Sequence, residues 1–253
     1  MPANFDGFLW LILALGPLVI LQRNLHREVQ WVFLLITRRL DIAVMLFSLI
    51  FFPGVLLHEG SHYLTARLVG VRTGKFSIIP RPLDRSRLQL GYVETAHSDW
   101  IRDALIGMAP LITGGLFVAY TGVLQLKLPE LAQVLWTGGV DAFSPLIDAL
   151  VSRPDFWLWI YLALVVSSTM LPSESDRRAW LPLGLVLGGT LGLSLVLGAG
   201  PWLAENAALP FNRMLRAIAS VFGISAFLHA ALLPFVWLAR RILSRLTGLD
   251  VVI

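Results

Sequence analysis

Long apolar runs alternate with shorter polar segments along the chain. Each run approaches the roughly 20 mainly apolar residues that a helix needs to cross the hydrocarbon core of a membrane. We therefore expect an all-α polytopic membrane protein with about six transmembrane helices. No Lys or Arg precedes the first run, so a cleaved signal peptide is not expected. The expected spans are Phe5–Leu21, Ile42–Val69, Ala104–Leu124, Phe156–Leu171, Trp180–Leu203 and Ala217–Ala239.

Two of the polar segments between the expected spans have sequences that suggest structure of their own. The segment Arg23–Asp41 is charged at both ends around the apolar run Trp31–Ile36, which predicts an interfacial helix or a short re-entrant piece. The segment Lys127–Arg153 contains Gly138-Gly139 and Pro145, which argue against one continuous helix.

A third connection, Arg72–Trp100, predicts a small hairpin. It contains two strand-like stretches, Lys75–Ile79 and Arg87–Thr95. Residues that favour turns lie between them, so we expect a β-hairpin-like loop directly after the second span. These turn residues are Pro80, Pro82, Asp84 and Ser86.

Composition supports a membrane protein and limits the chemistry. Of 253 residues, 57% are hydrophobic and 14% are charged, whereas soluble domains carry about 25% charged residues. The chain has no cysteine, so any metal must be held by His, Asp or Glu. The net charge of +4 comes without a basic patch interleaved with aromatic residues, so no nucleic-acid partner is expected. We expect one integral-membrane domain over 1–253.

The basic residues predict an orientation. The loops after the second and fourth spans would share one side of the bilayer with the tail around Arg240, and all three are basic, which places that side in the cytoplasm. The loop Lys127–Arg153 would then lie outside. With six spans, four arginines between the first and second spans would lie outside the cell, against the tendency of basic loops to lie in the cytoplasm. Either the region around Trp31 is not a simple loop, or the number of spans is off by one. These four are Arg23, Arg27, Arg38 and Arg39.

The second span ends in a metal-binding motif. His58, Glu59 and His62 form H-E-x-x-H on a helix, and residues four apart lie on the same face, one turn from each other. Zinc suits two neutral imidazoles and a carboxylate with one position left for water, whose pKa it lowers to about 7. Glu59 would take a proton from that water and pass it to the leaving amine.

An ordinary surface ion pair could produce the same five residues in a soluble helix. Here the motif continues an apolar span, where ionisable groups are costly and usually functional. We therefore favour one zinc ion per chain, although iron or cobalt would also suit these ligands.

The residues around the motif resemble a known family. Residues 58–77 have the sequence HEGSHYLTARLVGVRTGKFS. This is similar to the site-2 protease family of intramembrane zinc metalloproteases, in which H-E-x-G-H precedes an aromatic residue, Ala-Arg, Gly-Val and Phe-Ser. The matching positions are Tyr63, Ala66-Arg67, Gly70-Val71 and Phe76-Ser77. Ser61 stands where the family usually has Gly.

The resemblance implies a third ligand from a later span, in a pattern of Asn-x-x-Pro followed by Asp-Gly. Pro172 and Asp176 lie at the matching place after the fourth span, with spacing one residue shorter and Arg177 in place of Gly. Asp176 is therefore the expected ligand, with Glu174 as the nearest substitute. The alternative for Asp176 is a charged residue in a solvated turn. The remaining candidates would lie on the opposite side, and they are Asp141, Asp148 and Asp155.

The third span offers a weaker candidate. The family often has Gly-Pro-x-x-Asn here, and its Asn is thought to assist near the scissile carbonyl. Ala109 and Thr113 occupy the Gly and Asn places, so the Thr113 hydroxyl could donate to a developing oxyanion. Small residues that let helices pack closely are the slightly favoured alternative.

Two further histidines are excluded from the metal site. His97 lies near the end of the polar loop, and His229 lies inside the last span. A lone His is more often a hydrogen-bonded packing residue than a ligand, although an intramembrane position makes His229 the more interesting.

The resulting expectation is a zinc metalloendopeptidase that cleaves peptide bonds in or near a membrane span of another protein. The partners would be the lipid bilayer and a membrane-protein substrate, with a single span as the simplest case. We expect a multi-pass protein of a cell membrane whose active site opens toward the cytoplasm. The competing class is a non-catalytic zinc-binding membrane protein, which acts as a carrier, a sensor or a pseudoprotease scaffold. The presence of Glu59 argues against it, because a pure binding site needs no general base.

Overall fold

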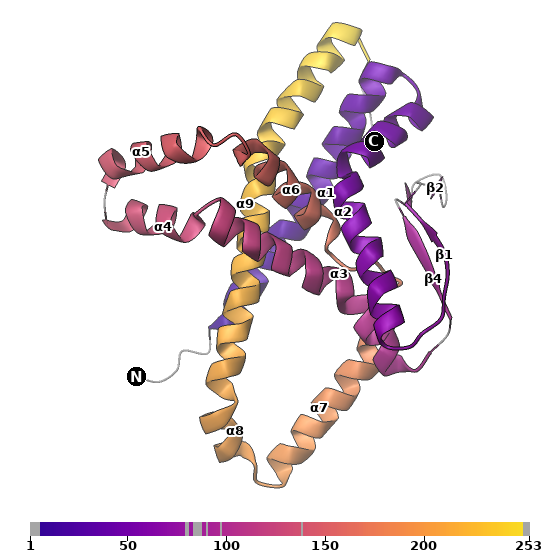
Figure 1. The fold of residues 1–253 in the computed structure, drawn as a ribbon, viewed down its shortest axis with the longest axis vertical. Coiled ribbons are helices and arrows are strands. Elements are labelled where there is room, and N and C mark those ends of the chain that lie inside the picture. The colour runs from indigo at the N-terminus through magenta and orange to yellow at the C-terminus, as the bar shows by residue number, and fades with distance from the viewer. Residues whose placement is uncertain are drawn as a thin grey trace.

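A computed structural model of the chain describes residues 6–78, 81–82, 88–89, 91–96, 98–137 and 139–249. The fold is mostly helical, with one small β region at its edge (Figure 1). The helices are α1 (Gly7–Thr37), α2 (Leu40–Leu68), α3 (Trp100–Tyr120), the π-helical turn η1 (Thr121–Gln125), α4 (Leu128–Thr137), α5 (Gly139–Val151), α6 (Phe156–Thr169), α7 (Trp180–Val196), α8 (Gly200–Asn206) and α9 (Ala208–Thr247).

The first helix is longer than its apolar run predicts. Helix α1 continues without a break from Gly7 to Thr37, so the predicted interfacial piece Arg23–Asp41 is mostly the second half of α1. The helix ends at Arg38, whose positive φ of 54° lets its N–H bond to the Leu34 carbonyl. The acid in this half is neutralised within the fold, because Glu28 is 5% exposed and pairs with Arg240 of α9. A charge that is paired in this way does not need a position at the membrane surface.

Helices α1 and α9 run parallel to each other. At their beginnings the Gly7 N–H donates to Asn212 Oδ1 over 2.8 Å, and further along Arg240 Nε donates to Glu28 Oε2 over 2.5 Å. The basic tail therefore lies at the end where α1 turns into α2, and the chain leaves the far end of α2 to form strands that lie beside that helix (Figure 1). The loop after the second span leaves from the other end of α2, so the tail and this loop lie at different ends of the fold. The expectation that they share one side of a membrane stays a prediction.

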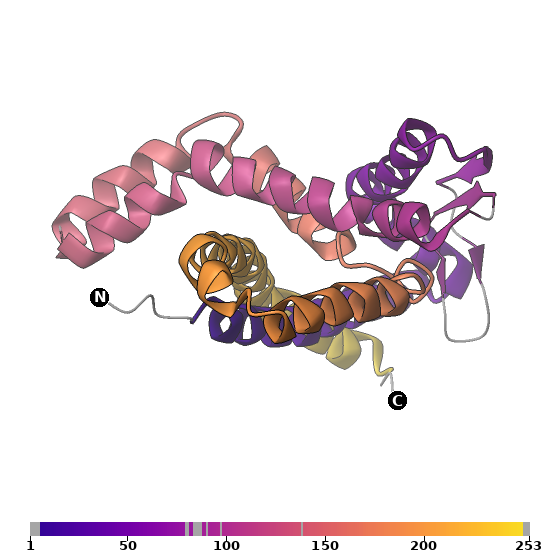
Figure 2. The ribbon, with the colours of Figure 1, turned by 90° about the horizontal axis from the view of Figure 1, so that it is seen from below.

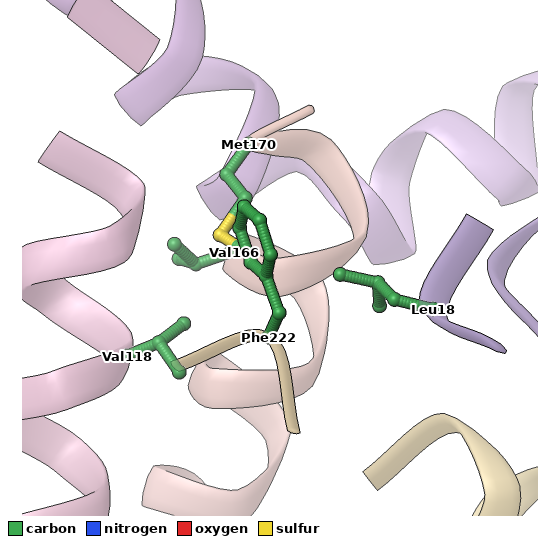
Figure 3. Packing of buried hydrophobic residues seen from close by; sticks show 5 residues of the cluster. All are labelled: Leu18, Val118, Val166, Met170 and Phe222. Carbon is green, nitrogen blue, oxygen red and sulfur yellow. The ribbon is translucent and has the colours of Figure 1, made fainter. Parts of the chain in front are cut away.

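Seen from below, the helices form two layers (Figure 2). Helices α3, α4 and α5 lie in one layer, α1, α7 and α9 lie in the other, and α6 passes between them. A cluster of apolar side chains from α1, α3, α9 and the end of α6 joins the layers (Figure 3). It consists of Leu18, Val118, Val166, Met170 and Phe222. The end of α6 is therefore held in the centre of the protein.

Among the described residues, four helices are long and apolar enough to cross a membrane, and up to six spans result if two bent helix pairs each count as one. The four are α1, α2, α3 with η1, and α9. Helices α5 and α6 meet at 87°, and α7 and α8 meet at 116°. The expected span Trp180–Leu203 is thus broken, with Gly198 at φ 87° and Pro201 at the start of α8. The coarse prediction of a helical multi-pass membrane protein is supported.

Helix α7 shows why lipid is the natural solvent. None of its residues is buried, and large apolar side chains cover it, among them Leu181, Leu185 and Val196. Monomeric soluble proteins rarely expose continuous apolar surfaces of this kind. In a bilayer such a surface carries no hydration penalty.

The predicted hairpin is present, with shifted bounds. Strand β1 (Thr73–Ser77) pairs antiparallel with β4 (Tyr92–Thr95), and the short β2 (Arg81–Pro82) pairs with β3 (Leu88–Gln89). Both β1 and β4 contact α2. The predicted turn residues Pro80, Asp84 and Ser86 lie outside the described residues. Between Lys127 and Arg153 the chain forms two helices, α4 and α5, so it is not one continuous helix, as predicted. Helix α5 begins at Gly139, whereas Pro145 lies inside α5 and does not interrupt it. Gly138 is outside the described part.

Candidate metal centre

Helix α2 presents the three motif residues from its last three turns. His62 and Glu59 are each 8% exposed, and His58 is half-buried. The imidazole ring centres of His58 and His62 lie 4.9 Å apart, with their planes at 81° to each other. The spacing of four residues therefore brings both rings to one face, as the sequence predicts.

Each imidazole is oriented by a backbone carbonyl from a different helix. His58 Nδ1 lies 2.6 Å from the carbonyl oxygen of Thr169, at the end of α6, and His62 Nδ1 lies 2.8 Å from that of Ile106 in α3. A carbonyl oxygen can only accept, so both Nδ1 atoms carry the proton. In the neutral imidazoles the lone pairs are then on the Nε2 atoms. This arrangement is typical of histidines that bind a metal.

Asp176 lies opposite the two Nε2 atoms. Its Oδ1 is 3.2 Å from His62 Nε2, and its Oδ2 is 3.7 Å from His58 Nε2. One ligand atom from each of the three residues lies within 4.8 Å of the others. Two donors at about 2.1 Å from a tetrahedral zinc ion are roughly 3.4 Å apart, so these separations fit a shared cation. The donor set of two nitrogens and one carboxylate suits zinc.

The loop after α6 brings Asp176 to this place. The Ser173 N–H donates to Asp176 Oδ2 over 2.7 Å and closes a turn. The Asp176 backbone then packs against Gly107 of α3 so closely that any Cβ at Gly107 would overlap its carbonyl oxygen. The substitute candidate, Glu174, is exposed and does not belong to the cluster of possible metal ligands, which consists of His58, His62 and Asp176.

The charge on Asp176 is favoured by its neighbours. Burial alone would raise the pKa of this carboxyl group. Hydrogen bonds with the His58 and His62 imidazoles, whose Nε2 atoms donate when the rings carry a second proton, and a hydrogen bond from the Ser173 N–H outweigh burial and lower the pKa below its ordinary value of 3.8. Asp176 is therefore ionised at neutral pH and can act as an anionic ligand.

Glu59 lies beside the cluster but outside it. It interacts electrostatically with His58, His62 and Asp176, and it makes no hydrogen bond or ion pair to any residue that the structure describes. The backbone at Gly91, just before β4, covers its side chain, because a Cβ at Gly91 would lie 2.7 Å from Glu59 Cγ. A buried carboxylate that has no hydrogen-bond partner among the described residues and lies next to three ligand groups is suited to accept a proton from water.

The remaining candidates lie elsewhere or are bound within a helix. The Thr113 hydroxyl donates to the Ala109 carbonyl of its own helix over 2.9 Å, so in this structure it is not directed at the cluster. Its role near an oxyanion stays a prediction. His229 is fully buried and hydrogen-bonded, in keeping with a packing role outside the metal site. His97 lies outside the described residues.

Sequence reasoning did not find the groups that orient the ligands. The Thr169 and Ile106 carbonyls carry no side-chain signal, since any residue supplies a carbonyl. Gly107 and Gly54 could have been noticed, because each is a small residue in an apolar span. Gly54 lets α2 approach α6 until a Cβ there would overlap the Val165 carbonyl oxygen.

Comparison of the chain with protein-family models, curated proteins and solved structures found no match to any of them. The functional argument therefore rests on the motif in α2 and on the geometry around it.

Proposed function

We propose that the chain is an intramembrane zinc metalloprotease, which hydrolyses peptide bonds in or near transmembrane segments of other membrane proteins. The observation that supports this most directly is the meeting of two Nε2 lone pairs and one carboxylate within 4.8 Å. Two lone pairs that face an anion repel it unless a cation or a proton lies between them. Glu59 beside this cluster supplies the base that hydrolysis needs.

The residues of the chain have separate tasks in this reaction. His58, His62 and Asp176 would hold the zinc ion, which supplies Lewis acidity and lowers the pKa of a coordinated water to about 7. Glu59 accepts a proton from the attacking water as the water oxygen forms its bond to the scissile carbonyl carbon. Glu59 then donates that proton to the amide nitrogen as the carbon–nitrogen bond breaks, so that a carboxylate and an amine leave.

A substrate segment must be unwound before it can react, because a membrane helix satisfies its own backbone hydrogen bonds. The β1–β4 pair packs against α2, and among the described residues no further strand pairs with either of its edges. An extended substrate segment could add to such an edge by backbone hydrogen bonds. A substrate with a single span would be the simplest to unwind locally.

We also propose that the centre opens toward the cytoplasm of a cell-membrane protein. The loops beside it carry Arg72, Arg177 and Arg178, which favour the cytoplasmic side. The tail around Arg240 no longer contributes to this argument, because it lies at the other end of the fold.

The decisive experiment combines zinc content with cleavage in Glu59→Gln. The purified wild-type protein and the variant should each bind one zinc ion, and only the wild type should cleave single-span test substrates. Glu174→Gln makes the same chemical change on the neighbouring loop and should retain both properties. A wild type that binds zinc but cleaves nothing across a panel of single-span substrates, or cleavage that persists in Glu59→Gln, would favour a non-catalytic carrier, sensor or scaffold.

A further inference from the structure

The last turn of α6 is fixed by a buried histidine of α9. His229 is fully buried and Ser168 is 1% exposed, and His229 Nε2 lies 2.7 Å from Ser168 Oγ. Ser168 directly precedes Thr169, whose carbonyl oxygen orients His58. Neither residue belongs to the metal centre, so this hydrogen bond connects α9 to the centre through one peptide unit.

The direction of this hydrogen bond follows from its surroundings. His229 Nδ1 lies 2.7 Å from the Ser225 carbonyl oxygen, one turn earlier in α9. The carbonyl can only accept, so Nδ1 carries the proton and Nε2 of the neutral ring is an acceptor. The Ser168 hydroxyl therefore donates to Nε2. Only this tautomer satisfies all three groups, which fixes the ring in one orientation.

A second helix holds the same residue from another direction. Gln22 Nε2 of α1 donates to the Ser168 carbonyl oxygen over 2.5 Å. The last four carbonyls of a helix have no partner within the helix and are available to other groups. In α6 one of them accepts from Gln22 and the next accepts from His58. The end of α6 is thus held by both α1 and α9 at the point where it meets the metal ligand.

We propose that His229 is a positioning residue for the metal centre. By holding Ser168 it sets the place of the Thr169 carbonyl, which orients His58, and it sets where the chain leaves α6 toward Asp176. The proposal rests on the proposed function for its metal. In the hydrocarbon region no water can replace a lost partner, so removal of the His229 acceptor leaves the Ser168 hydroxyl to find another one. The last turn of α6 then shifts and carries the carbonyl with it.

His26 of α1 provides a matched comparison. It is also an intramembrane histidine; the residue is partly buried, and its ring packs on Phe47 and Phe51. Its Nε2 atom has no hydrogen-bond partner within the described part of the chain. His26 therefore resembles His229 in chemistry and in its position between helices, and it lies near enough to interact with His229 electrostatically, but it makes no hydrogen bond to the end of α6 within the described part of the chain. A general effect of losing an intramembrane histidine should appear at both positions.

The test measures zinc affinity by chelator competition in the full-length protein, with His229→Phe, His229→Gln, Ser168→Ala and His26→Phe. His229→Phe should weaken zinc binding about 10-fold, near the lower end of losses for outer-sphere partners of metal ligands. His229→Gln, which can still accept from Ser168, should restore most of the affinity. Ser168→Ala should weaken binding in the same way, and adding it to His229→Phe should cause little further loss. His26→Phe should bind zinc like the wild type.

A second readout is the visible absorption spectrum of the protein loaded with cobalt in place of zinc, because this spectrum reports the geometry of the ligands around the metal. His229→Phe should alter that spectrum, and His26→Phe should leave it unchanged. The proposal is overturned if His229→Phe keeps wild-type affinity and spectrum, or if His26→Phe shows equal losses. Should His229→Phe fail to fold, Ser168→Ala decides the matter by the same criteria. Wild-type zinc binding in His58→Ala would instead refute the proposed function, whatever His229 does.

Discussion

The Nε2 atom of His62 lies 3.2 Å from the Oδ1 atom of Asp176, although the proton of that imidazole is donated elsewhere. Two electron-rich atoms at this distance need a positive charge between them. In the metal-free protein a second proton on the ring can provide it, and in the metal-bound protein the cation does. Metal binding should therefore be coupled to proton release.

This coupling predicts how zinc affinity depends on pH. The lowered pKa of Asp176 keeps its carboxylate ionised, and its stabilising contribution is lost only as the pH falls below the ordinary value of 3.8 and through the folded-state pKa. Protons on the imidazole Nε2 atoms are thus the ones that compete with zinc. Affinity should rise with increasing pH, by up to about tenfold per pH unit for each proton displaced, until those protons are lost. Titration calorimetry in buffers of different ionisation enthalpy counts those protons; an affinity independent of pH would contradict the geometry.

The identity of the third ligand predicts a difference between two neighbouring acids. Asp176→Ala should weaken zinc binding by more than the roughly 100-fold upper range for outer-sphere partners, because it removes a ligand itself. Glu174→Ala should bind zinc normally, since Glu174 is exposed and outside the cluster. Zinc content after dialysis against a weak chelator distinguishes the two. The opposite pattern would assign the ligand to Glu174.

Close packing against α3 predicts a third effect. Gly107→Ala places a methyl group on the Asp176 carbonyl oxygen, which should destabilise the fold by about 1–3 kcal/mol and weaken zinc binding. Gly115→Ala on the same helix is the control, because the nearest atom to its Cβ is 3.9 Å away. It should be neutral or stabilise by up to about 1 kcal/mol through helix propensity. Thermal unfolding in detergent compares them, and equal melting temperatures would be inconsistent with the observed contact.

The parallel arrangement of α1 and α9 predicts which segments share a side of the membrane. The chain has no cysteine, so single cysteines can be labelled without background. With a membrane-impermeant maleimide, Ser175→Cys beside the metal centre should react from one side and Leu246→Cys near the tail from the other. Arg38→Cys in the turn before α2 should behave like Leu246→Cys. Labelling of Ser175→Cys and Leu246→Cys from the same side would restore the arrangement expected from the sequence.

The parts of the site that depend on local geometry could be predicted from the sequence. The H-E-x-x-H spacing places His58 and His62 on one face of any helix, and the long apolar run around it ensures a helix. The β-hairpin after α2 is predictable for a similar reason, since strand-forming and turn-forming residues follow each other within a short segment.

The parts that depend on distant contacts could not be predicted. The choice between Glu174 and Asp176 depends on a turn closed by Ser173 and on the path of the loop past Gly107. The second half of α1 carries the acid Glu28, whose partner Arg240 lies 212 positions away in the chain, so the sequence does not show that this charge is paired inside the fold. The break near Gly198 is different, because Gly198 and Pro201 lie inside the apolar run, and Gly and Pro favour interruption of a helix.

The common direction of α1 and α9 constrains how the chain is threaded through the bilayer. If both helices traverse it, an odd number of traversals must separate them. Helices α2 and α3 supply two, so one of the bent pairs, α5–α6 or α7–α8, must supply the third traversal and the other cannot cross. The pair that does not cross would enter the membrane and return to the same side, and the loop that carries Asp176 joins these two pairs.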